Sequence, residues 1–234
     1  MLVRVYLLRM VWVALYMRNT PTPHALPLHA IITYSTVALL MGLVMDIDQT
    51  RMLYDKLHDG SIATDFMKPI SVPLYFFADG SGEVLFHAAL IVPSLLFSLL
   101  IVHIDVPAPG VLAAFFVSFL LGYFVGFFIN FILNCTAFWT LEIHAVQLIV
   151  TWITDLLGGE IIPLVIFPVV LQRIAYGLPF AAMFSTPLLI YVGAIPPSRY
   201  LEVMGLQLVW IVVLGAVATV MWRAGARRVV VQGG

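Results

Sequence analysis

The sequence predicts an all-α membrane protein that crosses the bilayer several times. Of its 234 residues, 62% are hydrophobic and only 10% are charged, whereas soluble domains carry about 25% charged residues. The mean hydropathy is +1.07, and several apolar runs approach the ~20 residues that a membrane-spanning helix needs. Together these observations predict about six transmembrane helices and one proline-broken, re-entrant helical segment before the last span.

Six apolar runs are the candidate spans: Leu2–Met17, Leu28–Met45, Val84–Ile104, Val111–Phe138, Ile143–Leu157 and Leu201–Trp222. The first run is short, because its rise of about 24 Å is less than the ~30 Å hydrocarbon core. Arg9 also falls near its middle. We expect this helix either to be partly buried among its neighbours or to continue a helix that begins before Met1.

The apolar stretch 161–193 differs from the spans because it contains Pro163, Pro168, Pro179 and Pro187, with Gln172 and Arg173 between them. A straight spanning helix tolerates one such proline rather than four. Non-helical backbone at membrane depth occurs only against protein or a water-filled cavity. The stretch is therefore predicted to form two half-length re-entrant helices, and a single kinked span is the alternative.

Two helix faces inside the spans are polar. In the fourth span, Ser118, Gly122, Gly126, Asn130 and Asn134 recur every four residues, and in the fifth span His144, Gln147, Thr151, Asp155 and Gly158 share one face. The GxxxG pair and the asparagines suit close helix packing. A substrate-facing or dimer-facing surface is the functional alternative.

The acidic end of the fifth span is expected close to a membrane surface. Asp155 precedes the Gly158-Gly159 break, and Glu160 is expected at the outer surface. Arg173 is available to pair with either acid. Such intrachain pairing is favoured over a proton relay through Asp155.

Basic residues near the span ends set the predicted orientation. With a cytoplasmic N-terminus, one side carries Arg51, Lys56, Lys68, Arg223, Arg227 and Arg228, and the other carries Arg18, Arg173 and Arg199. The chain is then a single transmembrane domain over residues 1–234, with a cytoplasmic segment at 46–83, a cytoplasmic tail at 223–234 and both termini inside.

The largest polar patch is HDGSIATDFMKPIS at residues 58–71. The preceding residues have helical character, and Gly60 is a natural helix stop. Ser61 or Thr64 can cap a second short helix, which Pro69 would end. The patch is predicted to form a short helix–turn–helix on the inner face, and a solvated loop is the alternative.

Motifs for catalysis and for metal binding are missing from the sequence. It has no GxxxxGK[ST] phosphate loop, no HExxH, no CxxC and no GxSxG, and its six histidines show no zinc spacing. Its one cysteine, Cys135, excludes an intrachain disulfide. The net charge of −1 gives no field to attract nucleic acid. We therefore predict no catalytic residue, no metal site, no cofactor in this chain and no nucleic-acid partner.

Three stretches carry a family resemblance. The patch HDGSIATDFMKPIS, the run GGEIIPLVIFPVVLQRIAYGLPFAAMFSTPLLIYVG and the terminal VVVQGG resemble ABC-transporter permeases of the type-2 exporter class, and within it an uncharacterised ABC-2-like family. The resemblance implies a multi-pass protein of a bacterial-type inner membrane, whose ATP and Mg are bound by a separate ABC ATPase dimer. It also implies a second permease subunit, alike or unlike, and surrounding membrane lipids.

The resemblance further assigns roles to residues. The patch would dock on the ATPase through Asp59, Gly60, Asp65, Lys68 and Pro69. The first, second and fifth spans would line the path between two permeases, and residues 161–193 would form a lid near the outer face. The rivals are a secondary transporter or channel without an ATPase, and a membrane scaffold. The substrate is not readable from the sequence.

Overall fold

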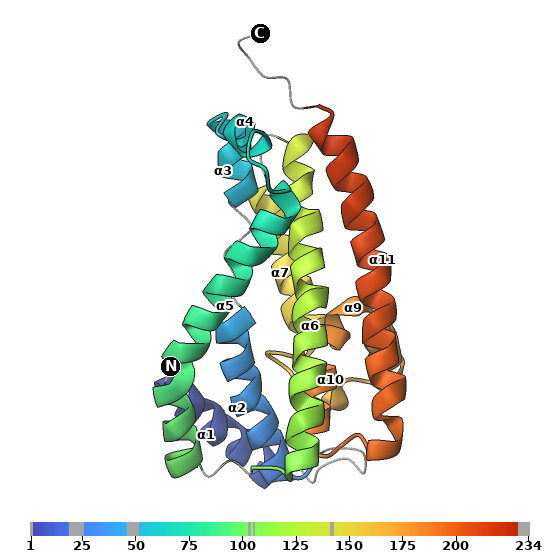
Figure 1. Cartoon of the computed structure of the whole chain (residues 1–234). Helices are drawn as coiled ribbons and strands as arrows, with labels where there is room; N and C mark the ends of the chain where they lie inside the picture. The colour runs from blue at the N-terminus through green and yellow to red at the C-terminus, as the bar shows by residue number, and fades with distance from the viewer. Residues whose placement is uncertain are drawn as a thin grey trace.

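The structure, a computed structural model, describes residues 2–18, 26–45, 52–102, 104, 106–140 and 143–228. The regular structure of these residues is entirely helical, which confirms the predicted all-α class. Figure 1 shows an elongated bundle in which the long helices run roughly along one axis. The expected features at residues 46–51 and in the terminal VVVQGG lie outside the described part of the chain.

Four helices of the described chain are long and apolar enough to cross a membrane. They are α2 (Leu28–Met45), α5 (Val72–Phe97) with its π-helical extension η1 (Ser98–Val102), α6 (Pro109–Cys135) with the 3₁₀ turn η2 (Thr136–Phe138), and η4 (Pro197–Arg199) running into α11 (Tyr200–Ala226). Their lengths agree with a polytopic membrane protein.

The first and fifth predicted spans also form helices, but shorter ones. Helix α1 (Leu2–Arg18) has 17 residues and α7 (His144–Gly158) has 15. At 1.5 Å per residue, α7 rises only about 22 Å, less than the ~30 Å hydrocarbon core. The number of complete membrane crossings therefore stays a prediction.

Helix α5 begins at Val72, earlier than the predicted start at Val84. The polar residues between these positions do not end the helix, because Ser81 and Glu83 face the bundle and only Asp79 is exposed. The Ser81 hydroxyl donates to the Phe77 carbonyl and lies 3.1 Å from the Tyr123 hydroxyl of α6. Part of the segment expected to be a cytoplasmic loop is therefore the first half of α5.

Helix α6 is the centre of the bundle. It runs beside α11 along most of its length (Figure 1) and packs against the small helices that precede α11. One apolar cluster joins α2, α6 and the segment around Phe184, and another joins α5, α6 and α11 near their shared end.

The proline-rich stretch forms four short helical pieces rather than two half-length helices or one kinked span. These are η3 (Leu164–Ile166), α8 (Val169–Gly177), α9 (Pro179–Met183) and α10 (Ser185–Tyr191). A proline lies at or near the start of each piece: Pro163 and Pro168 precede η3 and α8, Pro179 opens α9, and Pro187 lies in the first turn of α10. Proline suits a first helical turn because its missing N–H has no intrahelical partner there.

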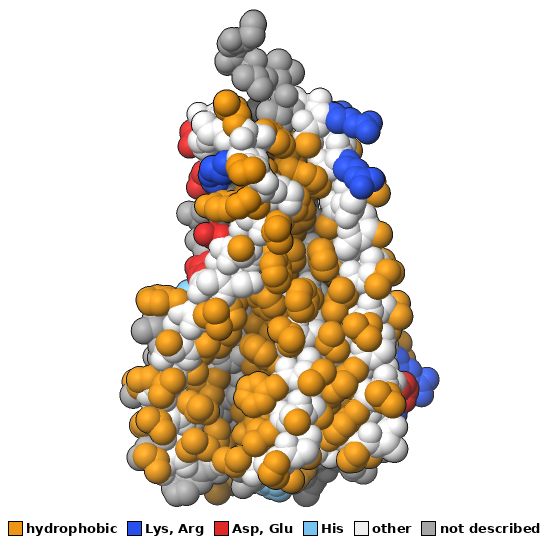
Figure 2. Space-filling model, in the orientation of Figure 1, with side chains coloured by type: hydrophobic (Ala, Val, Ile, Leu, Met, Phe, Trp, Pro, Cys, Tyr) orange, Lys and Arg blue, Asp and Glu red, His pale blue; other side chains and the backbone are white. Residues whose placement is uncertain are grey.

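The outer surface of the bundle is strongly apolar. Figure 2 shows hydrophobic side chains covering the long helices, with Lys and Arg gathered where α11 ends. Exposed aliphatic residues such as Leu201, Val212 and Val220 extend along α11. A soluble monomer rarely shows an apolar surface this extensive, so this face is suited to lipid or to another membrane subunit.

Candidate functional site

The polar patch forms a helix–turn–helix at one end of the bundle, as Figure 1 shows. Its helices are α3 (Met52–His58) and α4 (Ile62–Phe66), and we refer to residues 52–71 as the α3–α4 motif. Gly60 has a φ of +78°, a left-handed conformation that favours glycine. The Asp59 carboxylate accepts a hydrogen bond from the Ser61 N–H at 2.8 Å. Neither Ser61 nor Thr64 caps α4 through its side chain in the predicted way.

Asp65 holds the motif together through two ion pairs. Its carboxylate oxygens lie 2.5 Å from the Lys56 ammonium and 2.6 Å from that of Lys68. Both lysines also lie over the Tyr75 ring, at 4.6 and 5.1 Å from its centroid. The Asp65 side chain is only 5% exposed. Burial raises the pKa of Asp65, but the hydrogen bonds and charges of the two lysines outweigh burial and hold that pKa below its usual range.

The motif differs from expectation in which side chains face outward. Asp59, Gly60 and Pro69 are exposed and the Lys68 side chain is 51% exposed, whereas Asp65 points inward. Asp65 therefore positions the motif rather than presenting a charge to a partner.

Sequence reasoning missed an apolar surface on the motif, formed by Phe66, Met67 and Ile70. All three are exposed, and Met67 is 86% exposed. The signal was present in the letters FMKPI, where apolar residues interrupt an otherwise polar stretch. Only the inward turn of Asp65 shows which side of the motif these residues occupy.

Apolar contacts connect the motif to three long helices. Leu53 of α3 and Ile62 of α4 are buried in a cluster with Phe76 of α5, Phe131 of α6 and Ala218 of α11. The Phe66 ring lies 6.0 Å from the Trp222 ring of α11. A displacement of the motif would therefore act on all three helices, because packed interiors transmit strain.

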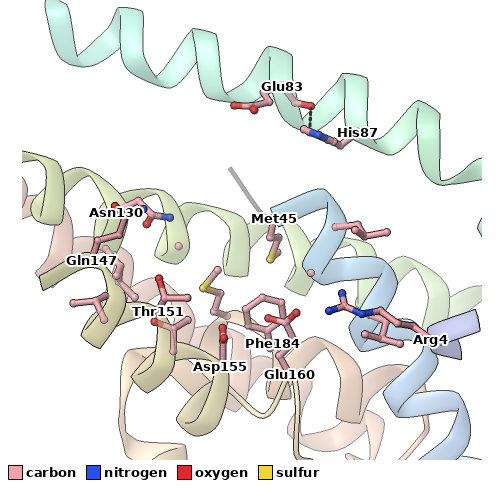
Figure 3. Close-up of a pocket in the computed structure, with 18 residues that line it drawn as sticks. Arg4, Met45, Glu83, His87, Asn130, Gln147, Thr151, Asp155, Glu160 and Phe184 are labelled. Atoms are coloured by element: carbon pink, nitrogen blue, oxygen red, sulfur yellow. Dashed lines mark hydrogen bonds between the residues drawn. The ribbon is translucent and has the colours of Figure 1, made fainter. Parts of the chain in front are cut away.

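A polar, partly open cavity of about 540 Å³ lies between the helices of the bundle. Figure 3 shows Glu83 and His87 of α5 facing Asn130, Thr151, Asp155 and Glu160 across an open space. Arg4 of α1 enters from another side, and Met45, Met183 and Phe184 form an apolar part of the wall. Ionisable residues within membrane proteins typically face such a cavity rather than lipid.

The two polar faces predicted from the sequence meet at this cavity. Gly126 and Asn130 of α6 line it together with Gln147, Thr151 and Asp155 of α7. The apolar sequence between α6 and α7 gave no sign that the two faces would come together.

Other members of these faces pack between helices instead. A Cβ on Gly122 would lie 2.6 Å from the Met183 carbonyl oxygen, so glycine lets α6 approach the backbone at the end of α9. Asn134 is buried and donates to the Asn130 carbonyl at 2.9 Å. His144 lies at the opposite end of α7, beside a second hollow that Tyr54 and Asp55 also line.

Glu160 lies at the cavity wall rather than at the outer surface. A Cβ on Gly42 of α2 would collide with the Glu160 carboxylate, so glycine makes room for the acid. Gly159 turns the chain into this position with a φ of +81°. Arg173, the expected partner of these acids, lies on the exposed side of α8 and outside the cavity wall.

Two further polar residues, which sequence reasoning did not single out, secure the broken segment. Gln207 of α11 is fully buried and donates to the Ala182 carbonyl at 2.7 Å and the Ser118 carbonyl at 3.0 Å, while the Ser118 hydroxyl donates back to it. The Tyr34 hydroxyl of α2 donates to the Gly159 carbonyl at 2.9 Å. The bonds to Ala182 and Gly159 satisfy carbonyl groups at helix ends, where an intrahelical partner is missing.

An all-α bundle with an apolar exterior, a partly open polar cavity and a charged motif at one end is the architecture of a multi-pass membrane protein. Residues 4–233 match the model of the ABC-2 family transporter protein, so the chain belongs to that family and is a membrane permease of an ABC transporter. Permeases of this family are generally non-catalytic and normally work with an ABC ATPase. No curated protein matches the sequence.

Proposed function

We propose that this chain is the membrane subunit of an ATP-driven exporter and that a separate ABC ATPase dimer drives it through the α3–α4 motif. ATP and Mg would bind to that ATPase, and a second permease subunit, alike or unlike, would complete the path. Export is the part of the proposal that rests on the family resemblance alone.

The observation that carries the proposal is the construction of the α3–α4 motif. Its inner side is fixed by the ion pairs of Asp65, while Phe66, Met67 and Ile70 remain exposed beside Lys68. A small apolar surface with a charged rim is typical of a protein interface. Here it lies on the motif at one end of the bundle (Figure 1), where Figure 2 also shows charged side chains.

Coupling would follow from the apolar contacts of the motif. Closure of the ATPase dimer would displace α3 and α4. The cluster around Leu53 and Phe131 would pass this displacement to α5, α6 and α11. Because α5 and α6 also carry parts of the cavity wall, their movement would change access to the cavity.

Co-purification tests the partner and the surface together. The full chain, isolated from its native membrane in lipid nanodiscs, is expected to retain a protein that mass spectrometry identifies as an ABC ATPase. Met67→Asp is expected to reduce the recovered ATPase about ten-fold or more, because it places a charge in an apolar contact. The control is Glu202→Gln at the far end of α11, which should leave recovery unchanged. A stable oligomer without ATPase would contradict the proposal.

We further propose that the α3–α4 end faces the cytoplasm of a cell bounded by a bacterial-type inner membrane, with both termini on that side. Lys56, Lys68 and the three arginines at the end of α11 all belong to this end. Basic residues favour the cytoplasmic side. In a Cys135→Ala background, Met67→Cys should resist a membrane-impermeant maleimide in intact cells, and Ser198→Cys should react. The reverse pattern would contradict this orientation.

A secondary transporter without an ATPase is the second candidate, and the cavity favours it. Asp155, Glu160 and Glu83 are acids inside the bundle, as ion-coupled transport requires. Transport measured in proteoliposomes separates the candidates. Dependence on ATP and the partner ATPase supports the exporter, whereas transport by this chain alone under an ion gradient supports the second candidate.

A further inference from the structure

We propose that the cavity binds an organic cation, meaning a molecule with a protonated amine or other onium group on an apolar body. The inference deepens the proposed function, because it treats the cavity as part of the permease path. It concerns the sign of the ligand's charge and the apolar character of the rest of the ligand, neither of which the family match specifies.

The described wall of the cavity carries an excess of acidic side chains. Three acids, Glu83, Asp155 and Glu160, line the cavity. Only two basic residues, Arg4 and His87, line it with them. Acids therefore outnumber bases in the described wall even when His87 is protonated. Inside a membrane bundle such an excess favours a cation over an anion, because water screens charges less there.

The acids come from separate elements and face one space. Glu83 projects from α5, Asp155 from the last turns of α7, and Glu160 from the turn after α7 (Figure 3). Gly42 leaves the room that the Glu160 carboxylate occupies. The negative side chains therefore face the cavity from two opposite walls, with Glu83 on one and Asp155 and Glu160 on the other, and a cation between the walls would be attracted from both.

The remainder of the wall combines apolar side chains with neutral polar ones. Phe184, Met45 and Met183 offer an aromatic ring and two polarisable thioethers, which suit the apolar and cationic parts of an onium compound. Asn130 and Gln147 add amide oxygens that can accept hydrogen bonds from an amine. No group of three or more His, Cys, Asp or Glu within the described chain could hold a metal ion. The lining therefore suits an organic cation better than a bare metal ion.

The test compares two probes of the same shape and opposite charge, tetraphenylphosphonium and tetraphenylborate. Their binding to the full chain is measured in nanodiscs of neutral phosphatidylcholine, and binding to empty nanodiscs is subtracted. We expect protein-dependent binding of the phosphonium to be at least about ten-fold tighter than that of the borate. We expect Glu83→Gln and Asp155→Asn each to weaken phosphonium binding by about ten-fold. The matched control is Asp79→Asn, which removes an exposed acid from the same helix as Glu83 but outside the cavity wall. Because an exposed charge is screened by water, this variant should change phosphonium binding by less than about two-fold.

Equal binding of the two probes, no protein-dependent binding of the phosphonium, or unchanged binding in the double variant of Glu83 and Asp155 would each overturn the inference. Because the measurement needs no ATPase, it is independent of the coupling proposal. If the wild-type chain binds the phosphonium but is recovered without an ATPase, the exporter is contradicted and the cation site is not. If it is recovered with an ATPase but does not bind the phosphonium, the cation site is contradicted and the exporter is not.

Discussion

Asp65 has a different role in the structure from the one that its place in the sequence suggests. In the sequence it is one of several charges in a polar patch, where contact with a partner is a reasonable expectation. In the fold its carboxylate is enclosed by Lys56 and Lys68, and both ammonium groups rest on the Tyr75 ring. The contacts that distinguish an internal ion pair from a partner contact join α3, α4 and α5. No local sequence pattern specifies these contacts.

Replacing Asp65 with Asn should loosen the α3–α4 motif. The change leaves the partly buried ammonium of Lys56 without its counter-charge, which costs about 1–3 kcal/mol in the local free energy of unfolding. Hydrogen exchange of residues 52–71 measures this cost. Asp59→Asn is the control, because an amide oxygen can still accept the Ser61 N–H. Equal protection in both variants would show that the ion pairs do not order the motif.

The same carboxylate gives the motif a dependence on pH. The folded-state pKa of Asp65 is lowered, so its stabilising contribution is complete above the ordinary aspartate pKa of about 3.9 and is lost as the pH falls through the lower folded value. Protection of residues 52–71, corrected for intrinsic exchange rates, should be constant from about pH 7 to 5. It should fall below about pH 4 in the wild type and change less in Asp65→Asn. An earlier loss, between pH 7 and 5, would assign the transition to another group.

Gly122 and Gly205 form a matched pair for testing helix contact. A Cβ on Gly122 meets the Met183 carbonyl at 2.6 Å, whereas a Cβ on Gly205 of α11 meets nothing within 4 Å. Gly122→Ala should therefore destabilise the protein by about 1–3 kcal/mol, and Gly205→Ala should be neutral or stabilising by up to about 1 kcal/mol. Thermal unfolding in one detergent compares the two. Similar losses in both would contradict the close approach of α6 to α9.

At the scale of elements, the sequence predicted that the proline-rich segment is broken but not how many helical pieces it forms. Four prolines in an apolar stretch predicted a broken segment, and the structure divides it into helical pieces that each have a proline at or near their start. The number of pieces was not predictable. It depends on bonds from distant helices, such as those of Tyr34 and Gln207, that satisfy the interrupted backbone.

Gln207→Leu tests that dependence. It removes the donor to the buried Ala182 carbonyl and breaks the paired bonds with Ser118, at a cost of about 1–3 kcal/mol. Hydrogen exchange in residues 179–191 should rise while exchange in α3 and α4 stays unchanged.

The control for this prediction is Thr219→Val, which removes only a local bond to the Gly215 carbonyl on the exposed side of α11. A rise in exchange that is equal in both variants, or spread over the whole chain, would mean that Gln207 does not specifically hold the broken segment.

The boundary of α5 marks a further limit of prediction from the sequence. The residues Ala78–Glu83 contain two glycines and two acids, so by hydropathy they belong to a loop. They continue the helix because Ser81 bonds within the bundle and Glu83 faces the cavity. Where the polar residues of a helix face a cavity, hydropathy alone does not detect that part of the helix.

At the scale of the whole molecule, composition predicted the class and the apolar runs predicted most of the helices. The two polar faces on α6 and α7 were also visible in the spacing of residues. Their meeting at one cavity, and the contributions of Arg4, Glu83 and His87 to its wall, come from the arrangement of α1, α5 and α7 around α6. That arrangement depends on contacts between residues far apart in the sequence.

The central claim is that a separate ATPase acts on this permease through the α3–α4 end. A photo-reactive phenylalanine analogue placed at Met67 and, in a second variant, at Ser198 tests it directly in native membranes. The account predicts a covalent adduct between position 67 and a protein identified by mass spectrometry as an ABC ATPase, with no such adduct from position 198. An ATPase adduct from position 198 alone, or none from position 67 in a complex that still contains the ATPase, would contradict it.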